Sequence, residues 1–188
     1  MTTRITSLIQ AFTINMLRLA LLGSLALAAP LLAVGQAAHD HSAPARLVQI
    51  VRQATQQFID VNATAVAGYG PAFGCVSGPD HGAMGIHYVN GALVGDGEID
   101  VWHPEALIYE PVGNKRRLVG VEYIVDAATW LAAHDNTPPA LEGQDFQFVA
   151  SPNRFNLPSF FELHVWAWRD NPNGAFVDWN NRVSCEGQ

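Results

Sequence analysis

The chain has 188 residues, and its 10 basic and 17 acidic side chains give it a formal charge of −7. This acidic balance, with scattered basic residues, argues against binding to nucleic acid or to an anionic membrane surface. One basic cluster, Lys115-Arg116-Arg117, precedes a strand-like run, as a solvated turn would.

The first 37 residues have the pattern of a secretory signal peptide. Arg4 and Arg18 come first, then the apolar run Leu19–Val34 and the small-residue end Gly35-Gln36-Ala37, with no acidic residue. This order predicts cleavage after Ala37 or Ala38 and a secreted or periplasmic protein.

The alternative is an uncleaved membrane anchor, but the apolar run is shorter than the roughly 20 residues that span a bilayer, and Pro30 interrupts it. Translation starts at Met1 or Met16, since the residues before Met16 add nothing to the signal. Cleavage leaves residues 38–188 as a single exported domain, with a formal charge of about −9 and no stable membrane span.

Residues 44–67 predict one amphipathic helix. Pro44 suits its first turn, and Gly68-Tyr69-Gly70-Pro71 ends it. Its apolar positions recur at three- and four-residue steps: Leu47, Ile50, Val51, Ala54, Phe58, Val61 and Ala65.

A glycine- and proline-rich segment, residues 68–85, predicts a long loop, and strand-like runs separated by turn residues follow it. The predicted strands are Met84–Asn90, Ala106–Glu110, Leu118–Asp126, Phe146–Val149, Phe160–Arg169 and Ala175–Trp179. A short helix is expected at Asp126–His134. Residues 136–142 and 151–158 are expected to be loops.

A helix followed by strands, without βαβ alternation, predicts an α+β fold. We expect the N-terminal amphipathic helix to pack on a curved, mainly antiparallel β-sheet or half-barrel. A cupin-like β-barrel is the alternative, and the leading helix argues against it.

Several phrases resemble those of a family of uncharacterised exported bacterial proteins. They are GxHYVN at 85–90, PEALIYEP at 104–111, RLVGVEYIV at 117–125 and FELHVWAWRDNPNGAFVDWNNRVSC at 161–185. The resemblance covers about residues 74–185 and implies a single exported domain without a known activity. Function must therefore be argued from the site.

Both cysteines, Cys75 and Cys185, lie in the exported part. Two cysteines in an oxidising compartment predict one disulfide, which would link the start of the domain to its C-terminus. A Cys/His metal site is the alternative, but no CxxC spacing favours it.

Three predicted strands each carry ionisable side chains on a face that is otherwise apolar, aromatic or glycine. His87 shares its face with Gly85 and Val89. Glu122 shares its face with Leu118, Gly120 and Ile124, and His164 shares its face with Glu162, Trp166 and Trp168.

If these faces converge, His87, Glu122 and His164 form a two-histidine, one-carboxylate set, which suits Zn(II), Fe(II) or Mn(II). Their side-chain tips must then lie within about 5 Å of one another, given metal–ligand bonds near 2.0–2.2 Å. His81, His103 and Glu105 are reserve ligands from loops. The alternative is that the histidines are hydrogen-bonded structural residues and that Glu122 pairs with Arg117.

A second metal hypothesis concerns the N-terminus. Cleavage after Ala38 would expose His39-Asp40-His41, whose amine, backbone nitrogens and imidazole can chelate Cu(II) or Ni(II), although such a tail is usually disordered. The sequence thus predicts an exported protein that binds a divalent metal (Zn, Fe, Mn or Cu). The alternative is a non-catalytic exported domain that binds an apolar small molecule or a protein partner between helix and sheet. The sequence specifies no reaction.

Overall fold

The computed structural model describes residues 46–186. The predicted signal peptide, its cleavage positions and the His39-Asp40-His41 hypothesis lie outside these residues. None of the helices in the described part of the chain is long and apolar enough to cross a membrane.

The N-terminal helical segment is divided into three pieces, so the prediction of one continuous helix was wrong. They are α1 (Arg46–Thr55), a 3-10 turn η1 (Gln56–Ile59) and α2 (Ala63–Val66). The break follows from local hydrogen bonds that compete with the helix. Asp60 is extended, and its carboxylate accepts from the backbone N–H of Asn62 at 3.0 Å.

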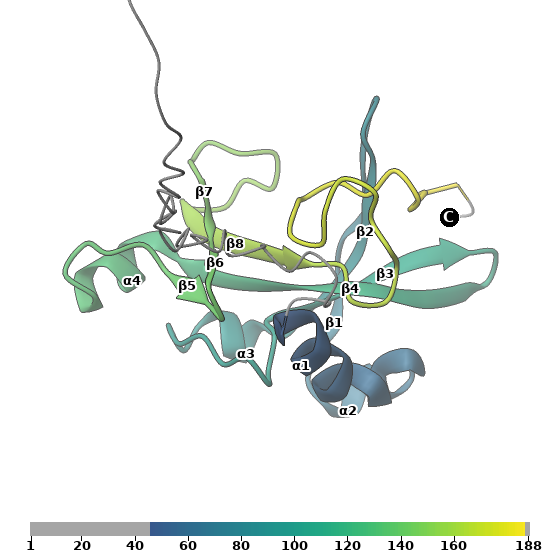
Figure 1. The fold of residues 1–188 in the computed structure, drawn as a ribbon, viewed down its shortest axis with the longest axis horizontal. Coiled ribbons are helices and arrows are strands. Elements are labelled where there is room, and N and C mark those ends of the chain that lie inside the picture. The colour runs from purple at the N-terminus through teal and green to yellow at the C-terminus, as the bar shows by residue number, and fades with distance from the viewer. Residues whose placement is uncertain (1–45, 187–188) are drawn as a thin grey trace, which may run out of the picture. The chain divides into compact units, whose positions relative to one another are not determined.

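Six antiparallel strands form one curved sheet in the order β1-β2-β3-β4-β8-β7 (Figure 1). They are β1 (Gly70–Gly78), β2 (Gly82–Val89), β3 (Ala106–Val112), β4 (Lys115–Asp126), β7 (Gln147–Val149) and β8 (Phe160–Val165). The predicted α+β class, with an N-terminal helix on a half-barrel sheet, is confirmed.

Strand β1 was not predicted, because its glycines and proline were interpreted as a loop. Proline is tolerated on an edge strand, and β1 is the edge of this sheet. The turn to β2 requires glycine at Gly82, where φ is +83° and a Cβ would lie 2.2 Å from the carbonyl oxygen of Asn180.

The predictions for the smaller helices and strands were correct in part. Helix α4 (Ala127–Ala133) is confirmed, and the Asp126 carboxylate caps it by accepting from Thr129 N at 2.8 Å. Residues 175–179 contain no strand, and α3 (Gly91–Val94), β5 (Ala140–Leu141) and β6 (Gln144–Asp145) were not predicted.

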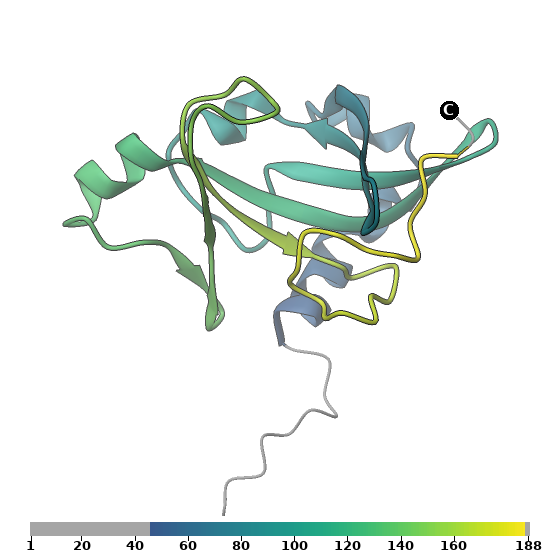
Figure 2. The same ribbon diagram turned by 90° about the horizontal axis from the view of Figure 1, so that it is seen from above.

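Helices α1 and α2 cover one face of the sheet, and the C-terminal segment crosses the other (Figures 1 and 2). The helix-side core contains Leu47, Val51, Tyr109, Val121, Tyr123 and Leu163. The opposite face has a smaller apolar cluster of Ala83, Ile108, Val119, Trp166 and Val183. The polar side chains described below lie on this second face.

Three side chains lie on the face opposite to the one predicted. A register shift between β3 and β4, just after Ile108, turns Leu118 toward the helix side and Val119 toward the other face. Strand β8 ends at Val165, so Trp168 also packs on the helix side, where its Nε1 donates to Thr55 Oγ1 at 3.0 Å. A β-bulge or a strand end breaks the alternation on which such predictions rest.

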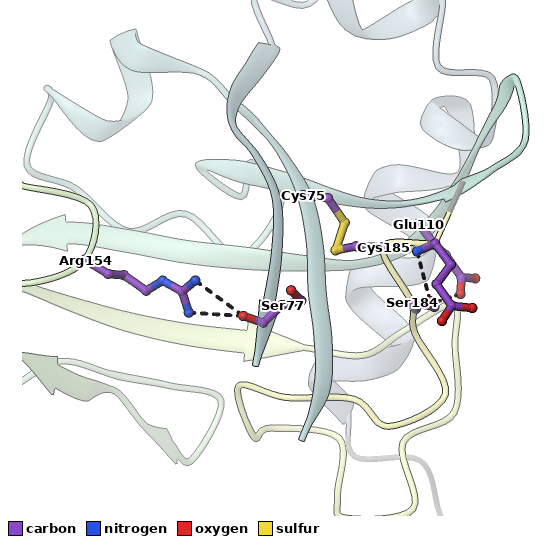
Figure 3. The surroundings of a disulfide bond; sticks show 7 residues. Cys75, Ser77, Glu110, Arg154, Ser184 and Cys185 are labelled. Atoms are coloured by element: carbon purple, nitrogen blue, oxygen red, sulfur yellow. Dashed lines mark hydrogen bonds between the residues drawn. A yellow bond between two sulfur atoms is a disulfide. The ribbon is translucent and has the colours of Figure 1, made fainter. Parts of the chain in front are cut away.

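The predicted disulfide between Cys75 and Cys185 is present (Figure 3). Their Cα atoms are 5.7 Å apart, and the bond links β1 to the C-terminal segment. Hydrogen bonds flank it: Ser184 N donates to Glu110 Oε1 at 3.1 Å, and Arg154 donates to Ser77 O. A disulfide is compatible with a periplasmic or extracellular protein.

Removing the disulfide with Cys75→Ser and Cys185→Ser together should lower the free energy of unfolding by about 3–5 kcal/mol, because the bond closes a loop of 110 residues. Urea denaturation of both proteins measures this difference. A change smaller than about 1 kcal/mol would mean that the bond does not constrain the unfolded chain as expected.

Candidate metal centre

His87, Glu122 and His164 converge on the sheet face opposite the helices. Each offers one donor atom, and the three atoms lie within 4.8 Å of one another. Glu122 on β4 pairs directly with His164 on β8. His87 lies on β2, across β3, and its Nε2 is 3.3 Å from Glu122 Oε2.

Strand β3 lies between β2 and β4 in the sheet. Ala106 of β3 is the register partner of Glu122, and Ile108 of the same strand is the register partner of His87. Ala106 and Ile108 are two residues apart, so His87 and Glu122 lie on the same face of the sheet.

All three side chains are buried, and three of the four imidazole nitrogens have no hydrogen-bond partner. The exposed fractions are 5% for His87, 4% for Glu122 and 1% for His164. Nδ1 of His87 and both ring nitrogens of His164 have no partner in the structure. Unpaired buried polar atoms are costly and uncommon, so they indicate an unfilled interaction.

Two further carboxyl groups border the set. Glu162 lies two residues before His164 on β8, on the same face, and, after burial, its charge raises the pKa of Glu122. Asp178, from the C-terminal segment, has its Oδ1 3.6 Å from His164 Nδ1 and accepts from Gln147 Nε2 at 2.8 Å. Donor atoms of Glu162, His164 and Asp178 also lie within 4.8 Å of one another.

Burial shifts the titration of every member toward its neutral form. It lowers the pKa of His87 to about 4, and burial together with the His87 ring lowers the pKa of His164 to about 3. Burial and then the Glu162 charge raise the pKa of Glu122 well above 4.5. Burial raises the pKa of Glu162 to about 7.

No basic side chain compensates these carboxyl groups. In the described part of the chain, no lysine or arginine forms an ion pair with Glu122, Glu162 or Asp178. Arg117, the alternative partner considered for Glu122, instead contacts Glu110 at 3.3 Å. The site therefore combines two neutral imidazoles with three carboxyl groups that have no basic partner in the described part of the chain.

A small cavity of about 30 Å³ adjoins the site. His87, Glu122 and Glu162 line it together with apolar side chains, among them Met84 and Phe160. The donors therefore face a space that can hold an ion or water.

The reserve ligands lie elsewhere. His103 is exposed, and its Nδ1 is 2.7 Å from Asp100 Oδ2. His81 lies in the turn between β1 and β2 and lines an open cleft that Asp178 also borders, but it belongs to neither donor group. Glu105 is buried and accepts from Ile124 N at 2.9 Å; burial raises its pKa to about 8.

Two members of this polar cluster were not in the predicted ligand set. Glu162 was predicted on the face of His164, where the structure has it, but was not proposed as a ligand. Asp178 fell within a predicted strand that does not form, and no local pattern points its side chain toward His164.

Comparison of the chain with protein-family models, with curated proteins and with solved structures found no match.

Proposed function

We propose that this domain binds a divalent transition-metal ion through His87, Glu122 and His164. One observation carries the proposal: two buried imidazoles with unpartnered ring nitrogens and a buried carboxyl group present their donor atoms within 4.8 Å. A single cation would bind the lone pairs of all three donor atoms simultaneously and would compensate the carboxylate charge.

Distances support the same proposal. Two ligands at about 2.05 Å from a tetrahedral metal lie about 3.3 Å apart, and His87 Nε2 and Glu122 Oε2 are 3.3 Å apart. Two imidazoles with one carboxylate suit Zn(II), Fe(II) or Mn(II) and leave positions open for water or a small ligand. Such a metal would supply Lewis acidity beside the adjoining cavity.

The alternative, an apolar ligand held between helix and sheet, draws less support. The interface between α1 and the sheet is filled by core side chains such as Leu47, Val51 and Tyr109. The cavity beside His87 lies on the other face and has a volume of about 30 Å³. A drug-sized ligand needs roughly 300 Å³ or more.

Titration of the metal-free protein with Co(II) or Zn(II) tests the proposal. We expect His87→Ala and His164→Ala each to weaken binding of the tightest equivalent at least about 100-fold, since each removes a ligand. Circular dichroism of both variants should show that the fold persists.

His103→Ala is the matched control, because it removes an exposed histidine outside the donor set. It should bind metal like the unaltered protein. Unaltered affinity in both His87→Ala and His164→Ala would refute the proposed site.

A further inference from the structure

The second donor group, Glu162, His164 and Asp178, overlaps the first through His164. We infer that the site is dinuclear: a second divalent cation binds beside the first, held by Glu162, Asp178 and His164. The inference rests on the proposed function, because the second cation shares a ligand with the first.

His164 is the residue that suits two cations. It is 1% exposed, and both of its ring nitrogens lack hydrogen-bond partners. Its Nδ1 is 3.6 Å from Asp178 Oδ1, near the spacing of about 3.3 Å between two ligands of one tetrahedral metal. To serve both cations the ring releases its remaining proton to solvent, and the second positive charge favours that loss.

The carboxyl groups supply the remaining ligands. Glu122 belongs to the first donor group and Glu162 to the second, so each cation has a glutamate of its own besides the shared His164. Gln147 holds the Asp178 carboxylate from β7, as hydrogen-bond donors commonly orient metal-binding carboxylates.

Charge favours two cations over one. Three carboxylates lie together without a lysine or arginine partner in the described part of the chain. One divalent cation leaves a buried negative charge when all three are ionised. With a second cation, the three carboxylates and the deprotonated His164 ring together balance the four positive charges.

Metal stoichiometry tests the inference. The metal-free, disulfide-bonded protein is titrated with Mn(II), and bound metal is measured by elemental analysis and by electron paramagnetic resonance. We expect two equivalents, with a spectrum broadened by coupling between ions about 6 Å apart, the spacing that metal–nitrogen bonds of about 2.05 Å on the two sides of one imidazole ring impose. Asp178→Asn should bind one equivalent and give the spectrum of an isolated ion.

Asp170→Asn is the matched control, since Asp170 lies on the same C-terminal segment but is exposed and paired with Arg182. It should retain two equivalents. One equivalent in the unaltered protein, with Asp178→Asn lowering only the affinity, would overturn the dinuclear site and make Asp178 a residue that orients His164. No binding at all would overturn the proposed function itself.

Discussion

Replacing Glu122 with glutamine should change stability in opposite directions with and without metal. In the metal-free protein the variant should be more stable than the unaltered chain at neutral and alkaline pH. Metal should then stabilise the variant by less than about 1 kcal/mol, against about 4 kcal/mol for the unaltered protein at a metal concentration 1,000 times the Kd.

The first effect follows from the raised pKa of Glu122. Above about pH 4.5 the unfolded chain loses this proton while the folded chain retains it, so the free energy of unfolding falls as pH rises. Glutamine does not titrate and abolishes this loss. It keeps a carbonyl oxygen toward His87 and an amide donor toward Glu162. The second effect follows because a neutral amide is a poor ligand.

Glu105→Gln is the control for this experiment. Glu105 is also a buried carboxyl group, with a pKa of about 8, but it lies outside both donor groups. Its replacement should likewise reduce the fall in the free energy of unfolding between about pH 4.5 and 8. Metal should still stabilise this variant as it stabilises the unaltered protein. Urea denaturation with chelator and with metal measures both quantities. Full stabilisation of Glu122→Gln by metal would contradict the assignment of Glu122 as a ligand.

Metal affinity should rise steeply between about pH 5 and pH 7, by about tenfold per pH unit for each proton displaced. The protons come from the carboxyl groups, because burial raises the pKa of Glu122 and raises that of Glu162 to about 7. For the first cation the histidines contribute little in this range. With pKa values of about 4 for His87 and about 3 for His164, both rings are already neutral.

Calorimetric titration in two buffers of different ionisation enthalpy counts the protons released. Glu162→Gln should reduce the pH dependence, and His103→Ala should leave it unaltered. An affinity that does not change over this pH range would show that the carboxyl groups are not displaced by metal.

Strand alternation predicted much of the site. Placing His87, Glu122 and His164 on defined strand faces was sufficient to expect their convergence. The same argument misplaced Leu118, Val119 and Trp168, because a register shift and the end of β8 at Val165 reverse the faces there. These irregularities depend on pairing with neighbouring strands, which a local pattern does not contain.

Loops were predicted less well than strands. Periodicity gives no direction to a side chain in a loop, so His81 and His103 were candidates for the set although they lie apart from it. Asp178 reaches His164 only because the C-terminal segment folds back over the sheet, where Ala83 bridges to Asn180 and the disulfide fixes its end. Such contacts between distant segments follow from tertiary structure.

The most direct test is a crystal structure of the protein grown with Zn(II), with anomalous diffraction measured above and below the zinc absorption edge. The proposed function predicts an anomalous peak about 2.0–2.2 Å from His87 Nε2, from a Glu122 carboxylate oxygen and from a ring nitrogen of His164. A map without a peak at this position, with ordered water satisfying the His164 nitrogens instead, would contradict it.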